Sequence, residues 1–166
     1  MRRRSVSLLV VSAFVLAPLV ALQLTATAAP QCTIVGTAAG NIIVGTGGRD
    51  VICAKGGNDA IDPRGGNDLV IAGPGDDVVR GSAGADVIKG GLGRDSLTGG
   101  AGPDKLFGGD GSDKCLDTKD AASGNDSASG GPGVDTGRRN PGDAFTGIER
   151  VENPPLVVCP PVPDPF

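Results

Sequence analysis

Residues 90–116 read GGLGRDSLT, GGAGPDKLF and GGDGSDKCL, three nine-residue units that follow one another without a gap. Each unit has glycine at its first, second and fourth positions and aspartate at its sixth. Position eight holds Leu97, Leu106 and Cys115. A fixed period of this kind indicates a repeat architecture, in which every unit is a small structural element that stacks on its neighbours.

The same period runs back to residue 36 without insertion or deletion, through GTAAGNIIV, GTGGRDVIC, AKGGNDAID, PRGGNDLVI, AGPGDDVVR and GSAGADVIK. Only the first unit departs at positions four and six, where it has Ala39 and Asn41. Position eight is apolar in all units, which places Ile43, Ile52, Ile61, Val70, Val79 and Ile88 in phase with Leu97, Leu106 and Cys115. Three columns in phase from residue 36 to residue 116 exclude a mere bias of composition.

Each unit predicts a tight turn followed by a short strand. Glycines in the first six residues allow positive φ and close backbone approach, so that backbone carbonyls can point inward. Side chains of positions seven to nine alternate between faces, and the apolar residue at position eight faces the core. One unit then makes half a coil, and units n and n+2 stack about 4.8 Å apart, the spacing of neighbouring strands.

This pattern resembles the repeats-in-toxin (RTX) nonapeptide G-G-x-G-x-D-x-U-x, a calcium-binding repeat in which U is a large aliphatic residue. The resemblance implies an all-β fold, a right-handed parallel β-roll (β-solenoid) over residues 30–116. It also implies Ca²⁺ between turns n and n+2, held by aspartates and backbone carbonyls in about six oxygen contacts, with at most about seven ions. The implied side-chain ligands are Asp50, Asp59, Asp68, Asp77, Asp86, Asp95, Asp104 and Asp113. The implied turn backbone is that of Gly73, Gly75, Gly81, Gly84, Gly90, Gly91, Gly93, Gly99, Gly100, Gly102, Gly108, Gly109 and Gly111.

The stacking of like charges predicts that metal and fold depend on each other. Aspartates of successive coils lie close together, and their mutual repulsion opposes folding unless a cation lies between them. We therefore expect the metal-free chain to be largely disordered and to fold when Ca²⁺ binds. The alternative is that these Asp and Gly residues form solvated turns without metal.

Beyond Leu116 the pattern weakens. It returns four residues out of phase as AASGNDSAS and GGPGVDTGR, where Asp126 and Asp135 fit position six but Ala128 and Gly137 are poor core residues. We expect loops or weak calcium turns here. The sequence FTGIERV (145–151) predicts a C-terminal capping strand over the open end of the roll, which otherwise exposes unpaired backbone. Residues 117–152 are thus assigned to degenerate repeats and a cap, and residues 153–166 to a proline-rich tail.

Residues 1–29 are typical of a signal peptide, because Arg2-Arg3-Arg4 is followed by an apolar run and then by small residues near Ala28. The alternative is an uncleaved membrane anchor, which Pro18 and the lack of a following positive cluster disfavour. The expected product is secreted and extracellular, without membrane insertion of the mature protein.

Four cysteines in an exported chain favour two disulfides. Three connectivities are open, and we prefer Cys32 with Cys53 and Cys115 with Cys159, which would fasten the two ends of the array. In an ideal register Cys32 and Cys53 lie three positions apart along the strand, so the N-terminal end must be irregular for them to meet.

The composition favours a binding protein over an enzyme. There are 19 acidic and 15 basic residues and no histidine, which argues against nucleic acid as a partner and leaves few groups for catalysis. Position seven is apolar in several early units, and Val51, Leu69 and Val87 should form an outward row with Ile71 beside it. This row is either an interaction face or seat for a cap, or ordinary β-propensity. Calcium binding is the expected function, and the alternative is an extracellular structural or adhesive scaffold in which calcium is purely structural.

Overall fold

The computed structural model describes residues 29–117, 125–138 and 142–151. Residues 1–28 of the predicted signal peptide and all of the predicted proline-rich tail lie outside these ranges. Within them, no helix has the length and apolar character needed to cross a membrane.

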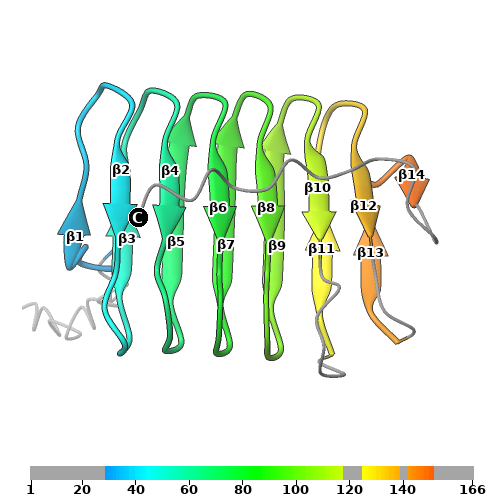
Figure 1. Cartoon of the computed structure of the whole chain (residues 1–166). Helices are drawn as coiled ribbons and strands as arrows, with labels where there is room; N and C mark the ends of the chain where they lie inside the picture. The colour runs from blue at the N-terminus through cyan, green and yellow to red at the C-terminus, as the bar shows by residue number, and fades with distance from the viewer. Residues whose placement is uncertain (1–28, 118–124, 139–141, 152–166) are drawn as a thin grey trace, which may run out of the picture.

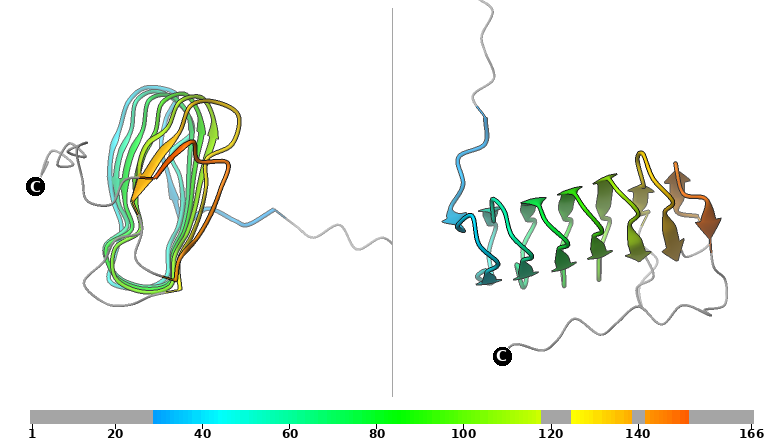
Figure 2. Two further views of the ribbon diagram at one scale, coloured as in Figure 1. Left: turned by 90° about the vertical axis from the view of Figure 1, so that its right-hand side faces the viewer. Right: turned by 90° about the horizontal axis from the view of Figure 1, so that it is seen from above.

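The chain forms a parallel β-roll of two seven-stranded sheets that face each other (Figures 1 and 2). One sheet contains the odd-numbered strands, β1 (Ile34–Val35), β3 (Val51–Cys53), β5 (Leu69–Pro74), β7 (Val87–Leu92), β9 (Lys105–Asp110), β11 (Ser127–Ser129) and β13 (Ala144–Thr146). The other contains β2 (Ile42–Val44), β4 (Ala60–Asp62), β6 (Val78–Arg80), β8 (Ser96–Thr98), β10 (Lys114–Asp117), β12 (Thr136–Arg138) and β14 (Arg150–Val151). The chain alternates between the sheets, so each strand pairs with the one two places along the sequence.

The register confirms that two nine-residue units make one coil. Val70 pairs with Ile88, and Ile88 pairs with Leu106, each partner 18 residues further on. Seen end-on, the coils superimpose in a flattened oval (Figure 2, left). Because every strand contacts only its neighbours in the stack, the fold is extended in one direction.

The core is one row of aliphatic side chains from each sheet. Position-eight residues from Ile52 to Leu106 have at most 1% of their surface exposed. Position one also faces inward, where the small side chains of Ala54 and Ala72 are fully buried. Burial of each Val, Leu or Ile side chain stabilises the fold by about 1.5–3 kcal/mol, so this narrow core supplies only part of the stability.

The predicted inward position of Cys115 is wrong. Strand β10 carries one extra residue relative to β8, because Lys114 pairs with Ser96 while Asp117 pairs with Thr98. Leu116 therefore occupies the core position and is fully buried. A bulge of this kind exchanges the face of the following residue, and the larger aliphatic side chain takes the buried place.

The out-of-phase units after residue 117 are complete parts of the roll and not loops. Ala128 pairs with Leu106 in β9, and Gly137 pairs with Leu116 in β10. The spacing between Ala128 and Leu106 is 22 residues instead of 18, so the four additional residues are accommodated outside the paired strands. The phase shift thus changes one connection and leaves the stacking intact.

The segment predicted as a capping strand continues the two sheets instead of crossing the open end. It supplies β13, which pairs with β11, and β14, which pairs with β12. Phe145 and Ile148 pack against the end of the core. A Cβ atom added to Gly137 would lie 2.7 Å from the Phe145 ring, so that ring uses the space left by the missing side chain.

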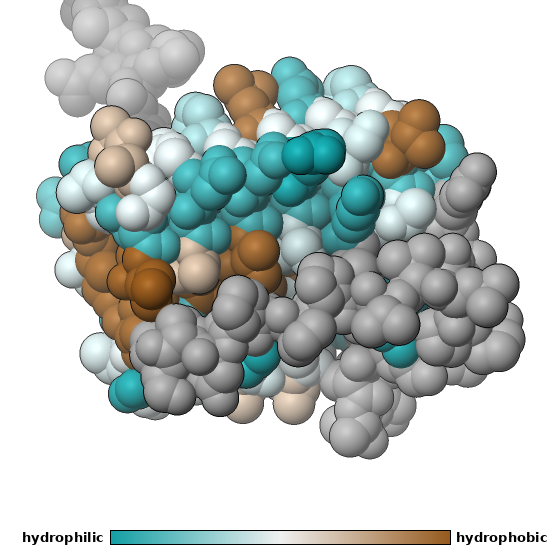
Figure 3. Space-filling view, turned by 45° about the horizontal axis from the view of Figure 1, so that its top comes forward, coloured by the Kyte–Doolittle hydropathy of each residue, from teal (hydrophilic) through white to brown (hydrophobic). Residues whose placement is uncertain are grey.

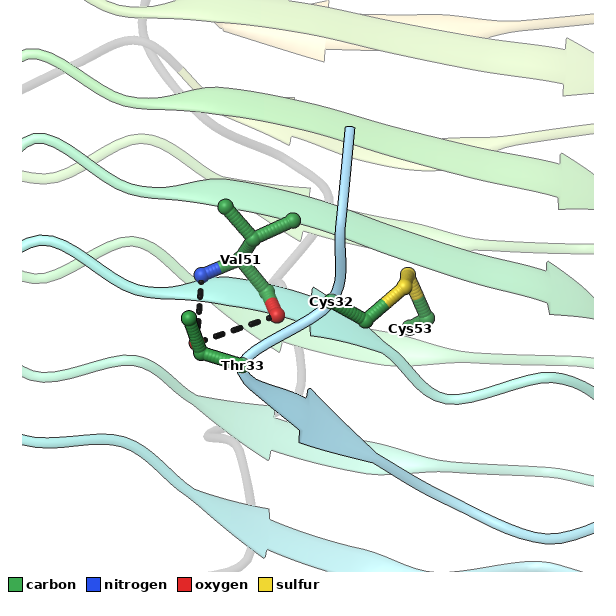
Figure 4. Close-up of a disulfide and its surroundings, with 4 residues drawn as sticks. All are labelled: Cys32, Thr33, Val51 and Cys53. Atoms are coloured by element: carbon green, nitrogen blue, oxygen red, sulfur yellow. Dashed lines mark hydrogen bonds between the residues drawn. A yellow bond between two sulfur atoms is a disulfide. The ribbon is translucent and has the colours of Figure 1, made fainter. Parts of the chain in front are cut away.

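The first coil is fastened by a disulfide between Cys32 and Cys53, as predicted, with a Cα–Cα distance of 5.8 Å (Figure 4). In the regular register Val35 pairs with Cys53, so the chain must leave the strand direction before Ile34 to bring Cys32 near. The side chain of Thr33 bonds both backbone groups of Val51 at this point. Cys159, the predicted partner of Cys115, lies outside the described residues.

The outer surface is uneven along the roll. In Figure 3 hydrophobic side chains gather toward the N-terminal end, and hydrophilic side chains line the edge formed by the turns. Ile42 at this end has 64% of its surface exposed. On the other sheet Val51, Leu69 and Val87 stack in register as predicted, and each is half-buried.

Candidate metal centre

The position-six aspartates form two ladders, one along each edge of the roll. All of them are buried, from Asp50 at 5% exposed to Asp113 at 0%. One edge contains Asp59, Asp77, Asp95, Asp113 and Asp135, and the other contains Asp50, Asp68, Asp86, Asp104 and Asp126. The structure therefore brings together, coil by coil, the side chains that the sequence identified.

One carboxylate oxygen of each rung is used by the backbone of the preceding coil. The N–H of Asp59 donates to Oδ1 of Asp77 at 2.8 Å, and the N–H of Asp77 donates to Oδ1 of Asp95 at 2.9 Å. The same bond joins Asp113 to Asp135 across the phase shift, at 2.8 Å. These bonds satisfy a backbone donor that the strand pairing leaves over, which explains why an acid is accommodated at an inward position.

The second carboxylate oxygen is buried and accepts no hydrogen bond in most rungs. This holds for Oδ2 of Asp59, Asp68, Asp77, Asp86, Asp95, Asp113 and Asp135. A buried acceptor without a partner costs about 1–3 kcal/mol, and more when it is charged. The ladder thus presents a series of anionic oxygens whose charge the polypeptide itself does not neutralise.

Glycine at position one leaves space beside that oxygen. A Cβ atom added to Gly81 would lie 2.8 Å from Oδ2 of Asp86, and one added to Gly90 would lie 2.6 Å from the carbonyl oxygen of Gly108 in the next coil. The space is therefore bordered by a carboxylate oxygen and a backbone carbonyl oxygen. Both are hard donors of the type that Ca²⁺ prefers.

Positions two and four give the turns their shape. Gly91 and Gly93 have φ of 133° and 128°, a region that disfavours residues with a side chain. All the predicted turn glycines at these two positions share it, namely Gly73, Gly75, Gly84, Gly91, Gly93, Gly100, Gly102, Gly109 and Gly111. Gly81, Gly90, Gly99 and Gly108 occupy position one and are buried.

Burial raises the pKa of the central carboxyl groups. The pKa rises to about 6 for Asp77, Asp86 and Asp113 and to about 7 for Asp95, mainly because burial penalises the charged form. Backbone hydrogen bonds oppose the rise, and neighbouring carboxylates of the same ladder add to it. The ladder in its charged form is therefore strained electrostatically unless a cation is present.

No group of three His, Cys, Asp or Glu side chains converges on one point among residues 29–117, 125–138 and 142–151. Each ladder contributes carboxylates singly, one coil after another. A cation between coils must complete its coordination with backbone carbonyls, as the resemblance to the RTX repeats implies and as Ca²⁺ accepts readily.

Two acids at the C-terminal end were missed. The Asp126 N–H donates to Oδ1 of Asp143 at 3.3 Å, and the Asp135 N–H donates to Oε2 of Glu149 at 2.7 Å. Asp143 follows a glycine and precedes Phe145 by two residues, which is the local signal of positions six and eight. Its spacing of 17 from Asp126 concealed it. Glu149 has no such signal, since a longer side chain from an irregular segment reaches the same donor.

The sequence comparisons agree with this geometry. The family model for the RTX calcium-binding nonapeptide repeat matches residues 33–61, 64–97 and 90–115. No curated protein matches the chain as a whole. The matched ranges contain the ladder from Asp50 to Asp113 and the glycine turns between coils. The repeat region of this chain therefore belongs to the RTX calcium-binding nonapeptide repeat family, and the protein is a calcium-binding β-roll.

Proposed function

We propose that this chain is an exported protein that folds as it binds Ca²⁺ between its coils. The observation that carries the proposal is the row of buried Oδ2 atoms without a hydrogen-bond donor, repeated along both edges of the roll. Export is supported by the charged and apolar pattern of residues 1–29 and by the Cys32–Cys53 disulfide, which suits an oxidising compartment.

The chain's own groups have distinct roles in this process. Oδ1 of each aspartate holds the N–H of the preceding coil and fixes the carboxylate, while Oδ2 is left for the cation. Glycines at position one keep side chains out of that space, and backbone carbonyls of the adjoining coil border it. Bound Ca²⁺ supplies the positive charge that allows neighbouring rungs to remain ionised. Binding energy then becomes folding energy, because the unfolded chain has no preformed site.

Circular dichroism of the mature chain in EDTA and then in millimolar Ca²⁺ tests this coupling. We expect a disordered spectrum in EDTA and a β-type spectrum that saturates with Ca²⁺, with a much weaker response to Mg²⁺, whose octahedral demand is stricter. A β-type spectrum that is unchanged by EDTA contradicts the coupling.

Asp77→Asn and its neighbour Asp76→Asn form a matched pair for the same assay. Asn at position 77 retains an Oδ1 acceptor for the Asp59 N–H but loses the charge, so the Ca²⁺ midpoint of folding should rise roughly tenfold, equivalent to about 1.4 kcal/mol. Asp76 is partly exposed and pairs with Arg94 at 2.7 Å, an ion pair of the exposed kind that contributes at most about 1 kcal/mol. Its substitution should leave the number of bound ions unchanged. Equal loss of calcium in both variants contradicts the assignment of the ladder.

A second candidate function is an extracellular scaffold that binds a partner or polymer through the row of Val51, Leu69 and Val87. The observation that favours it is their stacking in register on one outer face. A pull-down from cell-envelope material in Ca²⁺ and in EDTA, with wild-type protein and Leu69→Ser, separates the two functions. Specific retention that Leu69→Ser abolishes without loss of calcium binding favours the scaffold.

A further inference from the structure

The first two turns of the roll, 36–41 and 45–50, are closed by threonine instead of being open like the later ones. We call these two the threonine-closed turns. Thr37 and Thr46 occupy position two, where the later turns have glycine or, at Lys55, Arg64 and Ser82, another residue with positive φ. The difference bears on which turns of the family pattern take calcium, and so it deepens the function proposed above and rests on it.

In the second of these turns both oxygens of Asp50 have protein donors. The N–H of Thr46 donates to Oδ2 at 2.7 Å, and the Thr46 hydroxyl donates to the same atom at 2.9 Å. The hydroxyl of Thr33 approaches Oδ1 at 3.4 Å. The equivalent Oδ2 atom of Asp68, one coil further along the same edge, is buried and has no hydrogen bond.

The first turn repeats the arrangement with a neutral side chain. The N–H of Thr37 donates to Oδ1 of Asn41 at 2.7 Å, and Nδ2 of Asn41 donates to the Thr37 hydroxyl at 2.9 Å. An amide has no charge to be neutralised. Both turns thus satisfy their position-six side chain from within.

The backbone of these turns differs from that of the later ones. Gly57 and Gly66, at position four of the third and fourth turns, have φ of 92° and 129°. Gly48 occupies the same position in the motif, but its φ lies outside the left-handed region, as do those of Thr37 and Thr46. A β-branched residue strongly disfavours positive φ, so threonine at position two selects a turn in which its own N–H points at the position-six side chain.

We propose that threonine at position two makes these turns metal-independent, and that Asp50, although it fits the family pattern, supplies no ligand to calcium. Calcium at turn 45–50 would have to displace two hydrogen bonds to the oxygen it needs. The first coil is then held by the threonine bonds, the strand pairing of β1 with β3 and the Cys32–Cys53 disulfide, and the calcium-dependent coils stack on it.

The test counts the ions bound to the calcium-saturated protein by native mass spectrometry. Asp50→Asn should bind as many ions as the wild type, while the matched Asp68→Asn should bind fewer. Thr46→Gly, which restores the residue of the later turns, should bind one more ion than the wild type. That gain should disappear in the double variant Thr46→Gly with Asp50→Asn, because the additional ion requires the Asp50 carboxylate.

Two controls keep the count specific. Ser82→Gly introduces the same glycine at position two of a turn that already has positive φ, and it should leave the count unchanged. Thr46→Val keeps the β-branch and the N–H, and it should also leave the count unchanged. Loss of an ion in Asp50→Asn, or an unchanged count in Thr46→Gly, overturns the inference. A wild-type protein that binds no calcium refutes the proposed function instead, so the two failures are distinguishable.

Discussion

Gly48 and Gly66 both occupy position four of a turn on the same edge of the roll, but their surroundings differ. At Gly66 φ is 129°, and an added Cβ atom would lie 2.6 Å from the carbonyl oxygen of Gly48 in the preceding coil. At Gly48 the nearest atom to an added Cβ would be the Thr46 hydroxyl oxygen, at 3.9 Å. One motif position thus has two physical roles, and the motif alone does not distinguish them.

Gly66→Ala and Gly48→Ala should therefore have opposite outcomes. Alanine at position 66 meets backbone in a conformation that costs about 1–2 kcal/mol for a residue with a side chain, before the clash is counted. We expect a loss of at least about 2 kcal/mol in the free energy of unfolding of the calcium-loaded protein. Gly48→Ala should change it by less than about 0.5 kcal/mol. Urea unfolding in saturating Ca²⁺ measures both, and similar losses would show that the two turns share one conformation.

Single residues also mark the limit of what the sequence predicts. The aspartates, the turn glycines and the core residues from Ile43 to Leu106 were predictable, because one repeating geometry places each column in one environment. Asp50 was assigned with the rest, yet its environment depends on the φ of Thr46, a local choice between two turn conformations. Leu116 replaces Cys115 in the core because a bulge favours burial of the larger aliphatic side chain, and no repeat count reveals a bulge.

At the scale of the element, the two aspartate ladders are the parts of the roll in which charge, burial and backbone bonding are coupled. Each rung is bonded to the backbone of the coil before it, so loss of one coil removes a hydrogen bond from the next. Since the rungs share one low-dielectric edge, their protonation is also coupled.

The raised pKa values of Asp77, Asp86, Asp95 and Asp113 predict how the ladders respond to pH. In the unfolded chain these carboxyl groups ionise near their ordinary value of 3.8, while in the calcium-free roll burial raises their pKa to about 6 or 7. Between these values the unfolded state loses protons that the roll retains, so the calcium-free roll loses stability as pH rises from about 4 to 7. Circular dichroism of calcium-stripped protein should show more β-structure at pH 4 than at pH 7.5.

Calcium should show the reverse dependence, because it competes with those protons. The apparent affinity should rise between pH 5.5 and pH 7.5, by up to about tenfold per pH unit for each carboxyl that must lose a proton. Calorimetric titrations at several pH values measure it. An affinity that is constant over this range would show that the carboxyl groups are already ionised before calcium binds.

At the scale of the whole molecule, the roll is a stack of similar coils whose two ends are finished differently. The N-terminal coil has the disulfide and the threonine-closed turns, and the C-terminal coil has Phe145 and Ile148 against the end of the core. The period of nine predicted the two facing sheets and the pairing of units n and n+2. It did not predict how the four additional residues after residue 117 are accommodated, because a connection outside the sheets leaves no trace in the repeat.

Removal of the N-terminal disulfide by Cys32→Ser with Cys53→Ser should make the whole roll depend more strongly on calcium. The bond closes a loop with a sequence separation of 21, for which the chain-entropy account gives a stabilisation of about 3 kcal/mol. The Ca²⁺ midpoint of folding should rise accordingly, while the saturated spectrum remains that of the wild type. If the midpoint does not move, the first coil is not part of the cooperative unit that calcium folds.

The pairing of each strand with the one 18 residues away has a consequence for how such a protein changes length over evolution. Duplication or loss of one coil leaves every remaining strand in its own sheet and every acid on its own edge. A change of nine residues would transfer all later strands to the opposite sheet and place the turns of the two edges out of sequence with the N-terminal fastening. Lineages of this protein should therefore gain and lose length in pairs of units, so that genetic drift in size is quantised by the geometry of the coil.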